Sequence, residues 1–230
     1  MKKHNGGMMM RFSIFCLCVF LSVSFVSGIY AITDDFNDGN DTGWAQILGT
    51  WSVNNGEYVQ TETAFASTAT NDTYLRSFFG DVSWENYTFE AKVRIENGGT
   101  VAPIIGIFFR VTDKSATGDY YHFRLDTRAA EGPALIKSPN TILQENKTKP
   151  AKAGQNYILK VDVTGDNIKC YIDGQLEIEL QDSSFSKGAV GVGTFNTEGH
   201  FDDVNIISKD VTSAVSMNGK LTTTWASIKN

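Results

Sequence analysis

The sequence contains little cysteine, proline or histidine: 3, 4 and 3 of 230 residues, respectively. Cys16 and Cys18 lie in an N-terminal segment that we expect to be removed. Cys170 then stands alone, and the mature chain cannot form an intramolecular disulfide. The two remaining histidines, His122 and His200, are too few for a histidine-rich zinc site. Stability must therefore come from a packed core, for which the chain is long enough.

Basic residues are also scarce, because 20 lysines and arginines face 26 aspartates and glutamates. Lys2, Lys3 and Arg11 belong to the N-terminal segment, and without them the net charge is −9. No cluster of lysine and arginine reverses this sign locally. A chain of this charge gains nothing from nucleic-acid phosphates, so DNA and RNA are excluded as partners.

The sequence has one long hydrophobic run, Phe12–Val26, which follows Lys2, Lys3 and Arg11. It is shorter than the roughly 20 residues of a transmembrane helix. Small residues up to Ala31 offer a cleavage site. This pattern predicts a cleavable signal peptide over residues 1–31, a secreted or extracytoplasmic protein, and no membrane span after cleavage.

Alternation of apolar and polar residues dominates the rest of the chain, and helical periodicity is missing. Turn sequences such as Asn54-Asn55-Gly56 and Asp173-Gly174 separate the alternating segments. We expect a single all-β domain over residues 32–207, folded as an antiparallel β-sandwich of the jelly-roll type. The predicted strands are Trp51–Val53, Glu57–Gln60, Tyr87–Ile95, Ile104–Val111, Tyr120–Asp126, Ala134–Lys137, Tyr157–Val163, Ile168–Ile172, Gln175–Leu180, Val190–Phe195 and Phe201–Ile207.

Two segments fall outside this pattern. Residues 127–155 are expected to form a long loop with one short strand, of the kind that shapes binding sites at a sandwich rim. Residues 208–230 form a polar tail with a few apolar residues, among them Trp225. The tail either packs back onto the domain or binds a protein partner.

Several motifs resemble those of the concanavalin A-like lectin/glucanase jelly rolls, in their laminin-G-like and carbohydrate-binding-module branches. They include Asp34-Asp35-Phe36-Asn37-Asp38-Gly39, Gly43-Trp44, Gly106-Ile107-Phe108-Phe109-Arg110 and Tyr171-Ile172-Asp173-Gly174. The opening motif and the strand around Phe108 are also similar to the 3-keto-disaccharide hydrolase domain family. Both resemblances imply a saccharide ligand on the concave sheet. They also imply a structural calcium ion, with Asp35 and Asp202 as the favoured ligands, although these aspartates also suit turns.

The signatures of known catalysis are missing from the sequence. The E-x-D-x-x-E motif of the laminarinase-type glucanases is absent, as is a Gly-x-Ser-x-Gly elbow. If the chain is an enzyme, His122, Asp126 and Glu90 are the acid and base candidates.

One strand face carries side chains that suit a sugar. Aromatic rings pack on the C–H faces of sugars, and planar polar groups bind their hydroxyls. The alternative is a solvated polar face, which alternates in the same way. The predicted binding residues are Phe108, Arg110, Tyr120, His122, Arg124, Asp126 and Glu90.

Three functions follow from these features. The first is an exported carbohydrate-binding domain without catalysis. The second is a glycan-cleaving enzyme of the 3-keto-disaccharide hydrolase type that uses the same face. The third is a surface adhesion or assembly domain that binds protein through its outer faces and its tail.

Overall fold

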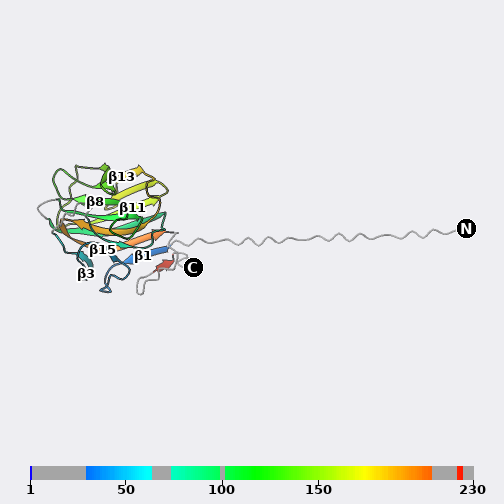
Figure 1. Ribbon diagram of the computed structural model, residues 1–230, viewed down its shortest axis with the longest axis horizontal. Coiled ribbons are helices and arrows are strands. Elements are labelled where there is room, and N and C mark those ends of the chain that lie inside the picture. The colour runs from blue at the N-terminus through cyan, green and yellow to red at the C-terminus, as the bar shows by residue number, and fades with distance from the viewer. Residues whose placement is uncertain (2–29, 64–73, 99–101, 209–221, 225–230) are drawn as a thin grey trace.

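The computed structural model describes Met1 and residues 30–63, 74–98, 102–208 and 222–224. In this part of the chain all regular structure is β, arranged as two antiparallel sheets packed face to face (Figure 1). The predicted all-β jelly-roll sandwich is confirmed. None of the described residues belongs to a helix of the length and hydropathy that a membrane span needs. The predicted signal peptide lies almost entirely outside the described residues.

The first sheet has β15 near its middle, hydrogen-bonded to β6 on one side and to β1 and β4 on the other. Its main path runs β13-β12-β11-β6-β15-β1-β16, and β3 pairs with β4. We call it the nine-stranded sheet. Its strands are β1 (Tyr30–Asp34), β3 (Trp51–Asn54), β4 (Glu57–Gln60), β6 (Tyr87–Gly98), β11 (Asn156–Thr164), β12 (Asn167–Ile172), β13 (Gln175–Gln181), β15 (Thr197–Ser208) and β16 (Thr222–Thr224).

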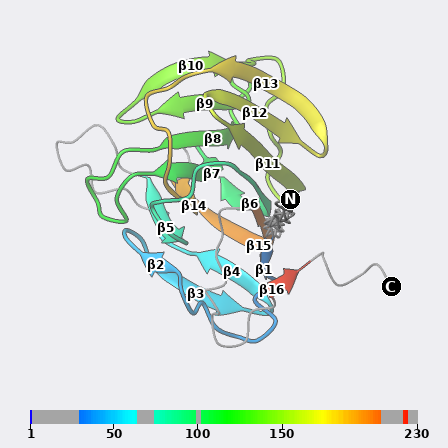
Figure 2. The same cartoon turned by 90° about the vertical axis from the view of Figure 1, so that its right-hand side faces the viewer.

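The second sheet has the order β10-β9-β8-β7-β14-β5-β2 and is called the seven-stranded sheet. In Figure 2, β7, β8, β9 and β10 follow one another across this layer, with β11, β12 and β13 in the other. Its strands are β2 (Ala45–Gln46), β5 (Leu75–Phe79), β7 (Ile104–Val111), β8 (Tyr121–Asp126), β9 (Ala134–Lys137), β10 (Thr141–Glu145) and β14 (Ala189–Phe195).

The space between the sheets is filled by the alternate side chains that the period-2 pattern predicts. Phe89 and Val93 of β6 meet Phe109 of β7 and Phe123 of β8, all fully buried. Cys170 is also buried in this core. Burial of this apolar surface stabilises the folded domain, in which Cys170 forms no disulfide.

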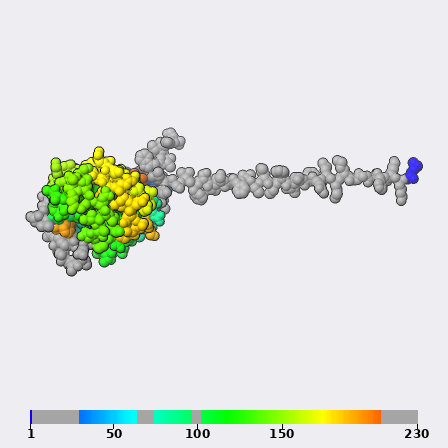
Figure 3. Space-filling view, turned by 90° about the horizontal axis from the view of Figure 1, so that it is seen from above, coloured from blue at the N-terminus to red at the C-terminus, as the bar shows by residue number. Residues whose placement is uncertain are grey.

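The edge strands β10 and β13 lie on the same side of the sandwich. Seen from that side, the green and yellow segments that hold them form a continuous surface (Figure 3). Two ion pairs cross between the sheets here, Lys149–Glu177 at 2.6 Å and Lys137–Asp182 at 3.2 Å. The region 127–155, expected to be mostly loop, thus contributes two strands, β9 and β10, to the seven-stranded sheet.

The two ends of the domain meet in the nine-stranded sheet. Tyr30 pairs with Ser208 of β15 and with Thr224 of β16, so β1 lies between them. The tail therefore returns to the domain through β16, as one of the two predicted alternatives requires. Trp225, expected to help the tail bind a partner, lies outside the described residues.

Candidate functional site

The outer face of the seven-stranded sheet, turned away from the core, carries a second cluster of aromatic side chains. The alternation along β8 directs Tyr120 and His122 to this face, as predicted, and Phe108 of β7 joins them. Phe78 of β5 and Tyr74 complete the set. We call these five side chains the aromatic layer.

Glycines beneath the aromatic layer give its rings room to lie close to the sheet. A Cβ on Gly106 would be 2.4 Å from Nε2 of His122 and 2.4 Å from the carbonyl oxygen of Phe123. A Cβ on Gly191 would be 2.4 Å from the ring of Phe78, and one on Gly193 would be 2.8 Å from the ring of Phe108. Larger residues at these positions would lift the rings or separate the strands.

His122 is enclosed by this layer. Its ring stacks on Phe108 with centroids 4.1 Å apart, and the ring of Tyr74 meets it edge-on at 4.4 Å. Neither ring nitrogen has a hydrogen-bond partner in the described part of the chain. Burial holds the pKa of His122 well below its ordinary value of 6.5, and the nearby Arg124 and Arg76 lower it further. The imidazole is therefore neutral at physiological pH.

Beside the aromatic layer lies a hollow of about 220 Å³, which we call the Arg124 hollow. Arg124 of β8 donates a hydrogen bond from Nη1 to the Tyr74 hydroxyl at 2.8 Å. Apolar surface and hydrogen-bond donors thus line the same small space. Six of the lining residues are Tyr74, Ile104, Arg124, Arg128, Asn140 and Phe195.

Asp126, a predicted site residue, is almost completely buried at the end of β8 and forms an ion pair with Arg128. Nη2 of Arg128 lies 2.6 Å from Oδ2 of Asp126, and its Nε donates to both carboxylate oxygens at 3.1 and 3.2 Å. The backbone N–H of Arg128 also donates to Oδ1 at 2.9 Å. The carboxylate therefore positions Arg128 at the hollow and is poorly placed to accept from a ligand.

Arg110 was expected on the same face as Phe108, and this is wrong. β7 bulges here, so that Phe109 and Arg110 together oppose a single residue of β14, and Arg110 takes a positive φ of 50°. The bulge reverses the alternation and buries the side chain. Its guanidinium donates to the carbonyl oxygens of Phe185, Glu85 and Gly165.

Glu90 was also expected on this face, and it too lies elsewhere. It belongs to β6 and pairs with Lys160 and Asn205 in the nine-stranded sheet, facing outward on the opposite side of the sandwich. Of the predicted binding residues, only Arg124 lines the hollow, while Phe108, Tyr120, His122 and Asp126 are buried in the same sheet, and Arg110 and Glu90 lie apart from them.

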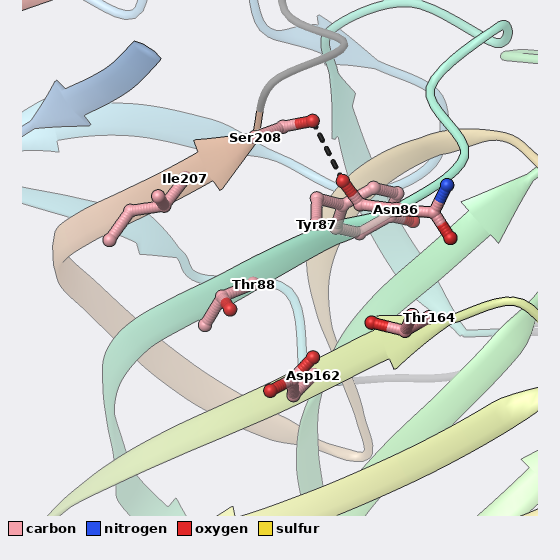
Figure 4. A pocket seen from close by; sticks show the side chains of 7 residues that line it. All are labelled: Asn86, Tyr87, Thr88, Asp162, Thr164, Ile207 and Ser208. Atoms are coloured by element: carbon pink, nitrogen blue, oxygen red, sulfur yellow. Dashed lines mark hydrogen bonds between the residues drawn. The ribbon is translucent and has the colours of Figure 1, made fainter. Parts of the chain in front are cut away.

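A different hollow, of about 270 Å³, lies on the outer face of the nine-stranded sheet (Figure 4). Thr88, Asp162 and Ile207 reach it from three neighbouring strands, and Ser208 donates to the carbonyl oxygen of Asn86 at 2.8 Å. Among its described lining residues there is no cation, and the one aromatic residue, Tyr87, is buried. Its chemistry therefore suits a sugar less well than that of the Arg124 hollow.

Of the two aspartates expected to bind calcium, Asp35 directly follows β1 and Asp202 lies on β15. Lys92 forms ion pairs with Asp202 at 2.6 Å and with Asp203 at 3.0 Å, while Asp35 accepts from the backbone of Asn37. No group of three acidic, histidine or cysteine side chains that could hold a metal occurs within the ranges described above. Lys92 occupies the carboxylate of Asp202 in this structure, and the calcium site at Asp35 and Asp202 stays a prediction.

Of the residues that line the Arg124 hollow, Arg124 was predicted from the sequence, and six were missed: Tyr74, Ala102, Ile104, Arg128, Asn140 and Phe195. Phe195 could have been found, because it shares the outer face of β14 with Gly191 and Gly193. Tyr74, Arg128 and Asn140 lie outside the strands, where period-2 alternation has no meaning.

Comparisons with known proteins agree with this architecture. A family model described as 3-keto-alpha-glucoside-1,2-lyase-like domain matches residues 31–207. An extracellular exo-alpha-L-arabinofuranosidase from Streptomyces chartreusis is 30% identical over 160 residues, which cover 67% of this chain and 18% of that protein. A levanase from Bacillus subtilis (strain 168) is 27% identical over 177 residues, 72% of this chain and 23% of the levanase. The chain thus spans about a fifth of each of these relatives.

Among solved structures, the carbohydrate-binding module CBM66 from Bacillus subtilis matches with a TM-score of 0.61 and 25% identity. The match covers 74% of this chain and 98% of the module. A Bacillus licheniformis beta-glucanase matches with a TM-score of 0.55 at 15% identity, over 76% of this chain and 97% of that one. The second match shows the shared fold alone.

Proposed function

The chain belongs to the 3-keto-alpha-glucoside-1,2-lyase-like domain family, and from that premise we propose that it is an exported domain that binds an oligo- or polysaccharide in the Arg124 hollow. A carbohydrate-binding or glycan-active role follows from the family and its relatives. The N-terminal pattern of residues 1–31 supports export, as does the extracellular relative.

One observation carries the proposal: aromatic rings and hydrogen-bond donors line the same hollow. Tyr74 and Phe195 offer rings for the C–H face of a sugar, while Arg124, Arg128 and Asn140 offer N–H donors for its hydroxyls. Ligand sites generally combine such apolar walls with a few convergent polar groups. A volume of about 220 Å³ suits a single sugar ring better than a long segment of chain.

The geometry favours binding over catalysis. Retaining and inverting hydrolases both need two carboxyl groups on either side of the scissile bond. Of the two carboxylates proposed as acid or base, Glu90 lies on the other sheet and Asp126 is held by Arg128. The described lining of the hollow contains no carboxylate.

One observation favours the enzyme as a second function. Elimination from a 3-keto sugar needs a base that removes the acidic proton beside the ketone, and neutral histidine is such a base. His122 is neutral, and its ring nitrogens have no partner among the described residues. A structural change that opened the aromatic layer would bring this imidazole to the ligand.

The test is incubation of the purified protein with levan and arabinan oligosaccharides, sucrose and 3-keto-sucrose, measuring both retention and released products. Retention without release supports the binding domain, and release of product supports the enzyme. If neither occurs with any saccharide, the proposal fails and the adhesion alternative gains support.

Variants connect the result to the hollow. Phe195→Ala should weaken retention about tenfold or more, since stacking and the apolar wall are lost together. Lys169→Gln, on the opposite sheet, is the control and should bind like the wild type. Equal affinities of all three proteins would place the ligand elsewhere.

A further inference from the structure

Arg124 has no acidic partner among the described residues, in contrast to Arg94 and Arg128. Arg94 pairs with Glu57 at 2.8 Å, and Arg128 pairs with Asp126 at 2.6 Å. For Arg124, no aspartate or glutamate of the described residues lies within ion-pair distance. Its recorded hydrogen bond goes to a neutral group, the Tyr74 hydroxyl.

The charge of Arg124 is not offset by other groups of the hollow. The second cation there, Arg128, is already neutralised by Asp126 and by Glu131 at 3.7 Å. The neighbouring His122 is uncharged, because burial and the two nearby arginines hold its pKa low. Both carboxylates near the hollow thus contact Arg128, and Arg124 is left without a direct counter-ion among the described residues.

The guanidinium of Arg124 also has fewer hydrogen-bond acceptors around it than it has N–H donors. A guanidinium has five N–H donors, and the described residues accept one of them. Its Nε is buried without a partner in the described part of the chain. A buried donor without an acceptor destabilises the protein, and so does a partly buried charge without a counter-charge. A ligand carboxylate that reaches the accessible part of this guanidinium supplies the missing counter-charge.

We propose that the Arg124 hollow selects a saccharide that carries a carboxylate, that is, a uronic acid residue. This inference rests on the proposed function, and it names the substrate class of the same site. A carboxylate matches the planar edge of the guanidinium and accepts two parallel hydrogen bonds from it. Neutral hydroxyls accept the same hydrogen bonds but leave the charge uncompensated. Tyr74 and Phe195 then contact the ring that bears the carboxylate.

The experiment compares tetragalacturonate with its fully methyl-esterified form by calorimetric titration of the purified full chain. The two probes share their ring geometry and differ in charge. The free acid should bind roughly tenfold or more tightly than the ester, as charge-assisted hydrogen bonds are about twice as strong as neutral ones. In Arg124→Gln the preference for the acid over the ester should vanish.

Two further variants keep the result interpretable. Lys169→Gln removes the same charge from the opposite sheet and should retain the full preference for the acid. If Arg124→Gln does not fold, Arg124→Met, which retains the apolar stem, takes its place.

The outcomes separate the two proposals. Equal or tighter binding of the ester, or binding of neutral levan or arabinan oligosaccharides but not of the acid, overturns the uronate inference and leaves the proposed function standing. A preference for the acid that survives in Arg124→Gln also overturns the inference. Failure of every saccharide to bind overturns the proposed function itself.

Discussion

The imidazole of His122 lies flat on the phenyl ring of Phe108, with 4.1 Å between centroids and 2° between planes. The two residues are direct partners across β7 and β8, so the stack is built into the register of the sheet. Gly106 lies beneath the imidazole and permits this close approach. The histidine is thereby packed like a phenylalanine. Its burial and the nearby charges of Arg124 and Arg76 oppose protonation of the imidazole.

Acid should destabilise the fold through this residue. The pKa of His122 is depressed in the folded state, while unfolded histidine keeps a pKa of about 6.5. Stability from this group is therefore complete above pH 6.5 and is lost as the pH falls below it, by up to about 1.4 kcal/mol per pH unit. His122→Phe should show a flatter dependence of the unfolding free energy between about pH 7 and about pH 5. Parallel curves for both proteins in urea titrations would contradict this assignment.

Arg110 should affect stability and leave binding unchanged. Its guanidinium is fully buried and donates to three backbone carbonyls, which Arg110→Ala would leave unsatisfied. We expect a loss of about 3 kcal/mol in the free energy of unfolding. Saccharide affinity, measured below the unfolding transition, should equal that of the wild type. If Arg110→Ala has normal stability but binds saccharide weakly, the prediction is wrong and Arg110 contributes to the binding site.

Sequence patterns located strands that alternate or form a continuous apolar run, such as β7, and they failed where neither pattern occurs. β5 was missed because its residues, Leu75-Arg76-Ser77-Phe78-Phe79, neither alternate nor form an apolar run, although all five are buried. Arg110 was misplaced because a bulge is invisible to a count of alternate residues.

Which side chains of one strand share a face could be predicted from the sequence, but which strands lie next to each other could not. The direction of His122 and Arg124 follows from alternation in β8. The assignment of Glu90 to the same face failed, because alternation does not say which of the two sheets a strand joins. That choice depends on pairing between distant segments, such as β6 with β15.

The ion pair between Glu57 of β4 and Arg94 of β6 should be a second acid-sensitive contact. Hydrogen bonds from Arg94 hold the pKa of this carboxyl below its ordinary 4.5, against the opposing effect of burial. Its contribution is therefore complete above pH 4.5 and is lost as the pH falls through the folded-state pKa. Glu57→Gln should cost about 1 kcal/mol at neutral pH and flatten the stability curve below about pH 4.5. Glu179→Gln, at an exposed ion pair, is the control and should change the thermal midpoint little.

Calcium binding at Asp35 and Asp202 would require Lys92 to release Asp202. In Lys92→Met the ammonium no longer competes, so added calcium should raise the thermal midpoint of this variant more than that of the wild type. Lys169→Met serves as the control for a lost lysine. If calcium and a chelator shift neither midpoint, the predicted calcium site does not exist.

The structure also bears on the cleavage position of the predicted signal peptide. Tyr30 and Ala31 pair with Ser208 and Ile207, so cleavage directly after Ala31 would remove two residues from β1. We expect N-terminal sequencing of the exported protein to begin at or before Tyr30. A first residue at Ile32 would mean that β1 and β16 are held by a shorter ladder than the full chain provides.

The central place of β15 has a consequence for the order of events during biogenesis. This strand, residues 197–208, pairs with β1, β4 and β6, whose residues are made roughly a hundred positions earlier or more. Contacts between such distant segments form slowly, and the nine-stranded sheet cannot close until nearly the whole chain has been synthesised. Under the export that we propose, the nascent polypeptide should still lack its native sheet while it crosses the membrane. The same topology that holds the finished sandwich together would then keep the chain unfolded for translocation.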